Sequence, residues 1–441
     1  MTPAVLALAL TLSKAIRNLN HANGVQTFTG EHAETVRVDR DAVLRTSWRP
    51  GPPEHSLGKT SMRIPHSLLV CAFGLLTVIG FADEPKIAPA LQPFVDSHSL
   101  AGAVTLVASK DKVLSLETVG FADIAAKKPM QADSVFWIAS MSKPITGTAL
   151  MLLVDEGKVN VDDPVEKYLP EFRGQMVVAY QDDSTKLLKR PRHPITVKNV
   201  LSHTSGLPFA SSVETPTLDL LPLREAVRSY ALTPLLFEPD SKYQYSNAGI
   251  NTAGRIVEVV SGMPFEKFVE ERLFQPLGMK DTTFWPNEEQ TARLAKSYKP
   301  NAAKTDLEEI QIGQLLYPLS DRTRRHPMPA GGYFSTAADM GRFCQMLLNG
   351  GTLDGRRYLS EAAVKQMTSK QTGEALKDGY GFGWSVSPTT FGHGGAHATN
   401  MTVDTQRGLV TVWMIQHAGF PNDGGNAQGA FNKAVHAAFA K

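Results

Sequence analysis

The chain has 441 residues, 42% hydrophobic and 20% charged, which are the proportions of an ordinary globular protein. Its formal net charge of +2 gives no reason to expect binding to nucleic acid or to a membrane surface. The two cysteines, Cys71 and Cys344, indicate neither a disulfide framework nor a metal site. A chain of this length allows two or three domains.

Residues 1–61 differ from the rest, because they join a short apolar run to polar sequence rich in glycine and proline. Met62 then opens a short basic stretch and an apolar run that ends in small residues, the pattern of a secretory signal peptide. That run is too short for a comfortable transmembrane helix. We therefore expect a non-native or disordered extension at 1–61 and a signal peptide at 62–82. The mature protein, periplasmic or secreted, would begin near Asp83.

Hydrophobic periodicity predicts strands at both ends of the remaining chain and helices in its middle. The expected elements are a helix at 87–98, strands at 101–109 and 112–120, an insertion with short strands at 174–195, helices at 195–201, 223–232, 251–261, 265–273 and 337–348, strands at 382–386, 400–403 and 409–416, and a helix at 429–439. This order predicts a sheet domain, 83–150 plus 326–441, with a helical domain, 151–325, inserted into it.

One stretch, Phe136–Thr146, has Ser140 and Lys143 three residues apart and is followed by an apolar run. Residues i and i+3 share a helix face, so the lysine amine can reach the serine hydroxyl. Burial favours the neutral amine, which can take the proton of a serine nucleophile. Pro144 fits only where a helix begins. We therefore expect Ser140 to open the helix, where its backbone N–H can stabilise an oxyanion.

A Ser-x-x-Lys spacing is a weak signal by itself. The chain has a second copy, Ser56–Lys59, beside glycine and proline and with no apolar helix after it, and we interpret that copy as chance. The interpretation of Ser140 therefore depends on partners later in the chain.

The second constellation, Tyr243–Gly249, contains Tyr245 and Asn247. A phenol near a lysine ammonium can lose its proton more easily and act as base or acid. An amide can both donate to and accept from a substrate or Lys143. The structural alternative for Tyr245 is a half-buried core residue whose hydroxyl is satisfied.

The third constellation, Phe391–Ala396, is predicted at the start of a strand and contains His393, Gly394 and Gly395. Glycines let a ligand approach the backbone closely. A backbone N–H from this stretch could therefore face that of Ser140 and complete an oxyanion hole with two donors.

His393 and His397 are four residues apart, a spacing that could suggest zinc. The glycines between them disfavour a helix, and no third ligand stands out in the sequence. We therefore expect no metal and no cofactor. A zinc hydrolase, the alternative, would lose its activity to a chelator.

Taken in order, Ser-x-x-Lys, Tyr-x-Asn and His-x-Gly resemble the three active-site motifs of the penicillin-recognising serine hydrolases. Among these the chain is most similar to the class C β-lactamase-like group, which also includes D-alanyl-D-alanine carboxypeptidases, D-amino-acid peptidases and serine carboxylesterases. The resemblance covers roughly residues 86–440, with Ser202–Gly206 and Tyr380–Trp384 as flanking matches. It implies an α+β fold of the β-lactamase/transpeptidase type, an antiparallel sheet flanked by helices with a mainly helical domain inserted.

The resemblance also implies a role for each matched residue. The implied catalytic residues are Ser140 as nucleophile, Lys143 as its activator, Tyr245 in the proton transfer, and Asn247 as the group that orients Lys143 and the substrate. The implied oxyanion-hole and substrate-binding residues are Ser140, Ala396, His393, Gly394 and Gly395. Lys143 and Tyr245 would titrate as a coupled pair, so the sequence leaves open which of them is the base.

The chain departs from the typical pattern at His393, where many relatives have lysine, and this removes a fixed positive charge opposite a substrate carboxylate. The sequence also lacks the glutamate-containing deacylation motif of class A enzymes and a Gly-x-Ser-x-Gly nucleophile elbow. An α/β-hydrolase is therefore disfavoured.

We predict a secreted serine hydrolase that forms an acyl-enzyme on Ser140. Esters of small acyl groups rank first as substrates, D-peptides second and β-lactams third, and loops such as 174–195 and 209–222 would decide among them. The expected partners are small-molecule esters, amides or β-lactams, with no nucleic acid and no stable membrane span after signal cleavage; no oligomeric state follows. The non-enzymatic alternative is an inactive penicillin-binding-like protein, against which the intact motifs argue.

Overall fold

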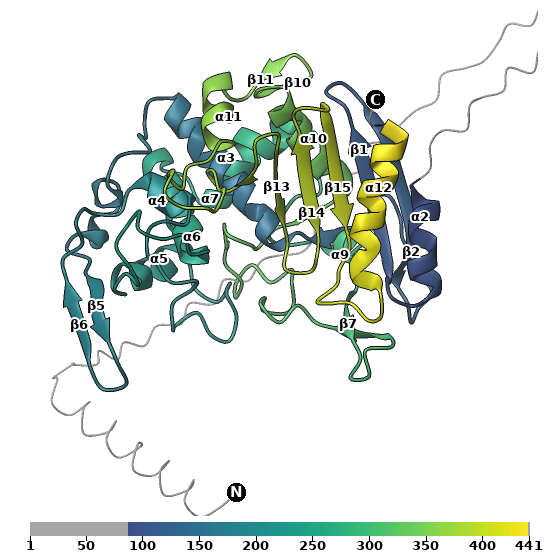
Figure 1. Ribbon diagram of the computed structural model, residues 1–441, viewed down its shortest axis with the longest axis horizontal. Helices are drawn as coiled ribbons and strands as arrows, with labels where there is room; N and C mark the ends of the chain where they lie inside the picture. The colour runs from purple at the N-terminus through teal and green to yellow at the C-terminus, as the bar shows by residue number, and fades with distance from the viewer. Residues whose placement is uncertain (1–86, 440–441) are drawn as a thin grey trace, which may run out of the picture. The chain divides into compact units, whose positions relative to one another are not determined.

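The computed structural model describes residues 87–439, and Figure 1 shows how their helices and strands are arranged. The predicted extension at 1–61, the predicted signal peptide at 62–82 and the second Ser-x-x-Lys copy lie outside the described residues. Within the described range, no helix combines the length and the apolar character that crossing a membrane requires.

A seven-stranded antiparallel sheet with the order β12-β13-β14-β15-β1-β2-β3 forms the centre of the fold. Its strands come from the two ends of the described chain: β1 (Gly102–Ala108), β2 (Val113–Asp123), β3 (Lys128–Pro129), β12 (Ser385–Val386), β13 (Thr390–Gly394), β14 (Asn400–Asp404) and β15 (Leu409–Met414). Every residue of β1 is buried. This is expected of a strand whose sheet is covered on both faces.

Helices cover both faces of this sheet (Figure 1). On one face α2 (Ala88–Asp96) and α12 (Ala427–Phe439) pack over a core that includes Val107 and Trp413. On the other face α10 (Ala337–Leu348) packs within the main core of the molecule. The sheet therefore holds β13, which lies between β12 and β14, in a fixed place, and β13 carries His393.

Most of the remaining helices lie between β4 and β9 in the sequence. They are α3 (Ser142–Asp155), α4 (Val197–Leu201), α5 (Leu223–Ala231), α6 (Asn247–Ser261), α7 (Phe265–Val269), the π-helical turn η4 (Glu270–Phe274), α8 (Gln275–Leu277) and α9 (Glu288–Ala292), with α11 (Glu361–Met367) nearer the C-terminus. Helix α3 is buried from Ser142 to Leu153, as its sequence, apolar nearly all round, predicts.

Four two-stranded ladders complete the described strands. They pair β4 (Phe136–Trp137) with β9 (Phe334–Ser335), β5 (Val177–Gln181) with β6 (Lys186–Lys189), β7 (Ser297–Pro300) with β8 (Leu307–Ile310), and β10 (Thr352–Leu353) with β11 (Arg356–Arg357). The β5–β6 hairpin lies inside the predicted insertion at 174–195, and every residue of β6 is exposed.

The predicted fold class is confirmed, and the extents of two predicted elements differ for clear physical reasons. Helix α6 begins at Asn247 and not at residue 251, because the Ser246 hydroxyl caps it by accepting a hydrogen bond from Gly249 N–H at 2.9 Å. The strand predicted at 382–386 is reduced to β12, because Gly383 has a φ of +81° and passes close to the backbone of Lys143. The division into a sheet domain and an inserted helical domain stays a prediction.

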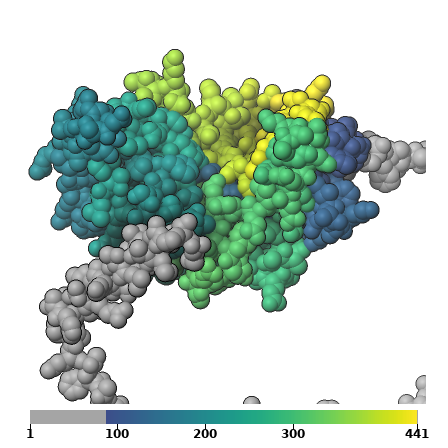
Figure 2. Space-filling model, turned by 90° about the horizontal axis from the view of Figure 1, so that it is seen from below, coloured from purple at the N-terminus to yellow at the C-terminus, as the bar shows by residue number. Residues whose placement is uncertain are grey.

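Figure 2 shows residues of the segment around 280–330, coloured green, beside the teal helical residues and below the yellow C-terminal residues. A buried ion pair anchors this segment: Arg325 Nε lies 2.7 Å from Asp219 Oδ2, and both side chains are at most 1% exposed. Asp219 also accepts from Leu316 N–H at 2.9 Å. Because a buried charge needs a partner and further hydrogen bonds, the predicted substrate loop at 209–222 is tied to the segment near residue 320.

Candidate active site

Ser140 lies in the 3₁₀ turn η1 (Ala139–Met141), which leads into α3 at Ser142. The predicted nucleophile therefore precedes the helix and does not open it. Ala139, the residue before it, has a φ of +45°, which is rare for a residue with a side chain, so the regular helix can start only after this position. The Ser142 hydroxyl stabilises the turn by donating to the Ala139 carbonyl at 2.6 Å. Strained residues of this kind concentrate at functional sites.

The Lys143 side chain is completely buried, and its amine makes three polar contacts. Nζ lies 3.1 Å from Ser140 Oγ, 2.7 Å from Asn247 Oδ1 and 2.8 Å from the Ala330 carbonyl oxygen. Burial holds the pKa of Lys143 well below its ordinary value. A neutral amine has two N–H donors and one lone pair. The amide and carbonyl oxygens can only accept, so each takes an N–H group. In the neutral amine the lone pair then faces Ser140, whereas the ammonium form donates to Ser140 Oγ as well.

Helix α6 positions two of the groups around this amine. Asn247 is its first residue, and Asn251, one turn later, accepts from Ala330 N–H at 3.0 Å through Oδ1. Both asparagines therefore fix acceptors for Lys143, one directly and one through the backbone of Ala330. Sequence reasoning missed Ala330, because the Pro-Ala-Gly-Gly stretch indicated only a turn and a carbonyl contact leaves no side-chain signal.

Tyr245 lies beside the same amine, with Lys143 Nζ 4.5 Å from the centre of its ring. Burial raises the pKa of Tyr245, and contact with the Ser140 hydroxyl offsets this only in part. The expectation that a neighbouring ammonium would ease loss of the phenol proton is therefore wrong, since desolvation of the phenolate dominates. The ring of His203 packs 4.5 Å from that of Tyr245 and fixes its position.

His393 is the fourth residue of β13, near the end of the strand and not at its start as predicted. Its Nδ1 lies 2.7 Å from the Gly394 carbonyl oxygen, and its Nε2 lies 2.9 Å from the Tyr380 hydroxyl. The carbonyl can only accept, so Nδ1 carries the proton and Nε2 accepts from Tyr380. Burial, with a smaller effect of the Lys143 charge, lowers the pKa of His393 to about 3. The imidazole is therefore neutral at pH 7.

The backbone after β13 runs against the turn that carries Ser140. A Cβ at Gly395 would lie 2.6 Å from the Ile138 carbonyl oxygen, so only glycine allows this approach. Gly395 N–H donates to the Thr399 carbonyl at 2.8 Å. Within residues 87–439, neither Ser140 N–H nor Ala396 N–H donates a hydrogen bond to another residue. Both predicted oxyanion donors are thus available to a ligand.

His397 has a different environment from His393. Its ring meets Trp137 edge-on at 4.9 Å, and its Nδ1 lies 3.1 Å from Ser297 Oγ. Across residues 87–439, no three histidine, cysteine or acidic side chains are placed to hold a metal ion.

The antiparallel sheet covered by helices, with a serine, a buried lysine, a tyrosine and an asparagine at one end of α3, is an arrangement of the β-lactamase/transpeptidase-like fold. The chain belongs to the beta-lactamase family, whose family model matches residues 87–434.

Similar proteins include a mycobacterial protein, an esterase and a hydrolase of solved structure. Protein Rv1367c of Mycobacterium tuberculosis (strain ATCC 25618 / H37Rv) is 34% identical over 358 residues, which are 73% of this chain and 87% of the relative. Esterase EstB of Burkholderia gladioli is 35% identical over 218 residues, 46% of this chain and 53% of EstB. The solved structure of EstCE1, a hydrolase with promiscuous acyltransferase activity, is 26% identical with a TM-score of 0.66, covering 79% of this chain and 97% of EstCE1.

Proposed function

We propose that the protein is a serine hydrolase that cleaves esters of small acyl groups through an acyl-enzyme on Ser140. The observation that carries the proposal is the environment of Lys143, a buried amine that donates to Asn247 and Ala330 and lies 3.1 Å from Ser140 Oγ. In its neutral form it can turn its lone pair to the serine hydroxyl. A serine hydroxyl needs such a base before it can attack a carbonyl.

In the proposed mechanism, Ser140 Oγ attacks the ester carbonyl while Lys143 takes its proton. The N–H groups of Ser140 and Ala396 stabilise the oxyanion of the tetrahedral intermediate. Tyr245, protonated because of its burial, passes a proton to the departing alkoxide and recovers one from Lys143. Water then attacks the acyl-enzyme while the same pair takes its proton, and the pair returns a proton to Ser140 Oγ as the carboxylic acid leaves.

The choice of esters over peptides and β-lactams follows from His393. D-alanyl peptides and β-lactams present a carboxylate, which a fixed positive charge would recognise. The neutral imidazole of His393, engaged by Gly394 and Tyr380, provides none. The likeness to EstB and EstCE1 supports the same choice. A D-peptidase and then a β-lactamase are the alternatives, and an inactive penicillin-binding-like protein is the non-enzymatic one.

A comparison of three substrates tests this proposal. We expect the protein to hydrolyse p-nitrophenyl butyrate with a higher kcat/KM than a chromogenic cephalosporin or a peptide that ends in D-Ala-D-Ala. The fastest turnover of the peptide would identify a D-peptidase, and that of the cephalosporin a β-lactamase. No turnover of any substrate, together with no adduct from a fluorophosphonate, would leave a binding protein on a hydrolase fold.

Replacing His393 by lysine is expected to change this preference. A lysine would place a positive charge where the neutral imidazole lies. An interaction of about 1.4 kcal/mol between this charge and a substrate carboxylate would raise kcat/KM tenfold. The ratio of kcat/KM for the cephalosporin to that for p-nitrophenyl butyrate should therefore rise by at least about tenfold. His393→Gln, which adds no charge, is the control and should leave the ratio near that of the wild type. An unchanged ratio in His393→Lys would contradict the proposed role of this position.

Replacing Tyr245 by phenylalanine is expected to slow the hydrolysis of esters, and most strongly of those whose leaving group needs a proton. A general acid contributes about 10² to 10⁴ when the leaving group needs a proton. Ethyl butyrate should therefore lose about 10³-fold in kcat, and p-nitrophenyl butyrate much less, because p-nitrophenolate leaves unprotonated. Tyr243→Phe, two residues away, is the control and should affect both esters equally. Equal losses in Tyr245→Phe would argue against proton donation by this residue.

We also propose that the mature protein is exported. The sequence at 62–82 supports a cleaved signal peptide. A protein expressed from Met62 in a Gram-negative host should reach the periplasm with an N-terminus near Asp83, measured by intact mass. Retention in the cytoplasm with residues 62–82 attached would refute export.

A further inference from the structure

The segment Ser202–Gly206 has no role in the proposed mechanism, although its residue His203 packs against Tyr245. His203 is 1% exposed, and its φ of +62° lies in the left-handed region that residues with a side chain rarely adopt. Strained backbone of this kind persists only where its surroundings hold it, and it is concentrated at functional sites. The contacts that hold His203 in this conformation therefore bear on the active site.

His203 is hydrogen-bonded to both chain neighbours of Tyr245. Its carbonyl oxygen accepts from Gln244 N–H at 2.9 Å, and its Nδ1 accepts from Ser246 N–H at 3.2 Å. A backbone N–H can only donate, so Nδ1 is unprotonated and the neutral ring carries its proton on Nε2. Burial, with a smaller effect of the Lys143 charge, holds the pKa of His203 well below its ordinary value. The Nδ1 acceptor is therefore present at neutral pH.

The His203 ring also packs against the phenol ring of Tyr245. The two ring centroids are 4.5 Å apart, and the His203 centroid lies at the same distance from that of Tyr380. Tyr380 is 2% exposed and donates to His393, so the His203 ring rests against a side chain that is itself held. In a close-packed interior, a tilt of Tyr245 toward His203 would require both other rings to move.

Asn247, two residues after Tyr245, has an anchor of its own. Its N–H donates to the Phe209 carbonyl at 2.9 Å, and it is the first residue of α6. Its side chain accepts from the Lys143 amine at 2.7 Å. Loss of the His203 contacts should therefore displace Tyr245 more than Asn247 and the amine that Asn247 holds.

We propose that His203 is the positioning residue for proton transfer by Tyr245. Through Gln244, Ser246 and the phenol ring, it holds the Tyr245 hydroxyl where the alkoxide departs. This inference rests on the proposed function, in which Tyr245 passes a proton to that alkoxide. A misplacement of about 1 Å can cost a reaction about 10²-fold, so a residue that acts only through Tyr245 can have a large effect.

Replacement of His203 by phenylalanine tests this role, because phenylalanine keeps a ring and removes the acceptor for Ser246 N–H. We expect kcat/KM for ethyl butyrate to fall about 10²-fold. The value for p-nitrophenyl butyrate should fall severalfold at most, because p-nitrophenolate leaves unprotonated. In the Tyr245→Phe background, the same replacement should add no further difference between the two esters, because the donor is already gone. Equal losses for both esters in the single variant, or a further difference in the double variant, would overturn the proposal.

Two more variants separate the contacts of His203 from its effect on folding. Glycine adopts a positive φ without strain, so His203→Gly takes the place of His203→Phe if that variant does not fold, and it should show the same dependence on the leaving group. Asparagine tolerates the left-handed region better than most residues, and its side-chain oxygen can accept from Ser246 N–H. His203→Asn should therefore recover most of the lost ethyl butyrate hydrolysis. No recovery would contradict the role of the Nδ1 contact.

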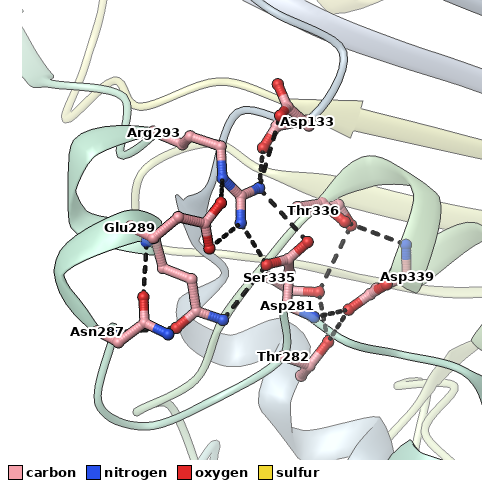
Figure 3. Close-up of polar contacts among 10 residues, drawn as sticks. Asp133, Asp281, Thr282, Asn287, Glu289, Arg293, Ser335, Thr336 and Asp339 are labelled. Atoms are coloured by element: carbon pink, nitrogen blue, oxygen red, sulfur yellow. Dashed lines mark hydrogen bonds and ion pairs between the residues drawn. The ribbon is translucent and has the colours of Figure 1, made fainter. Parts of the chain in front are cut away.

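Two buried residues outside the site provide structural controls. His417 is 1% exposed, and its Nε2 accepts from Ala101 N–H at 3.1 Å, the same kind of bond that His203 makes. Figure 3 shows Asp339, which accepts from the Thr282 hydroxyl at 2.8 Å. His417→Phe and Asp339→Ala should lower Tm but leave the ratio of kcat/KM for the two esters unchanged. A change of that ratio as large as in His203→Phe would show that general destabilisation causes the effect.

The Tyr245→Phe variant distinguishes failure of this inference from failure of the proposed function. Leaving-group dependence in Tyr245→Phe but none in His203→Phe would overturn the role of His203 alone. Equal losses for both esters in Tyr245→Phe, or no hydrolysis of either ester by the wild type, would overturn proton donation by Tyr245 and, with it, the role of His203.

Discussion

Replacement of Ser140 by alanine is expected to lower kcat for p-nitrophenyl butyrate by about 10⁵-fold, because the loss of a nucleophile leaves only binding and the oxyanion donors. The same substitution should abolish the mass increase that a fluorophosphonate gives on the wild type. Ser140 is the hydroxyl within 3.1 Å of the buried Lys143 amine. Intact mass spectrometry and steady-state kinetics on the same protein samples measure both effects.

Ser142→Ala is the matched control for this substitution. Ser142 is buried and lies two residues from Ser140. Its hydroxyl donates to the Ala139 carbonyl and is not among the groups that the Lys143 amine contacts. Its loss should loosen the turn and slow hydrolysis by far less, and labelling should persist. An adduct on Ser140→Ala, or equal losses in the two variants, would show that another residue is the nucleophile.

Replacement of Lys143 by methionine is expected to lower kcat/KM for the same ester by about 10⁴-fold, the upper range for loss of a general base. Methionine has a similar length and fills the buried space without an amine. The Ser140 hydroxyl would then keep its proton at neutral pH. The rate of labelling by the fluorophosphonate, followed over hours, should fall by a similar factor as kcat/KM.

The pH dependence of the wild type provides an independent measure of Lys143. The amine acts as a base only when neutral, so kcat/KM should rise with pH as Lys143 loses its proton and then level off. Since burial holds its pKa well below 10.5, this rise should lie well below the pH at which an exposed lysine titrates. A rise that begins only near pH 10 would contradict the buried neutral amine.

Lys143 is expected to support activity but to lower the stability of the folded protein. Its pKa is lower in the folded than in the unfolded chain, so the unfolded chain binds the additional proton and Lys143 opposes folding at neutral pH. This penalty disappears as the pH rises through the unfolded value. Lys143→Met removes it but leaves Asn247 and Ala330 without a donor, so we expect a net change within about 2 kcal/mol in urea unfolding. A larger loss of stability would mean that misfolding explains the lost activity.

The sequence alone was sufficient for features that depend on neighbours along the chain. The spacing of Ser140 and Lys143 predicted that the amine reaches the hydroxyl, and the apolar run after them predicted the burial of α3. The insertion predicted at 174–195, with short strands, contains the β5–β6 hairpin. The order of strands and helices, with the resemblance of three motifs, led to the correct fold class. These features depend on local periodicity and spacing, which a single sequence displays directly.

Only the tertiary structure could decide how the distant segments meet. The Lys143 amine contacts Asn247, which is 104 residues away in the sequence, and the Ala330 carbonyl, which is 187 residues away. The protonation of Tyr245 and His393 likewise depends on burial, which comes from groups far apart in sequence and reversed the expectation for Tyr245. Desolvation and carbonyl contacts belong to the packed chain, because they depend on what surrounds a residue and not on which residue it is. The sequence therefore located the candidate groups, and packing determined their charge states.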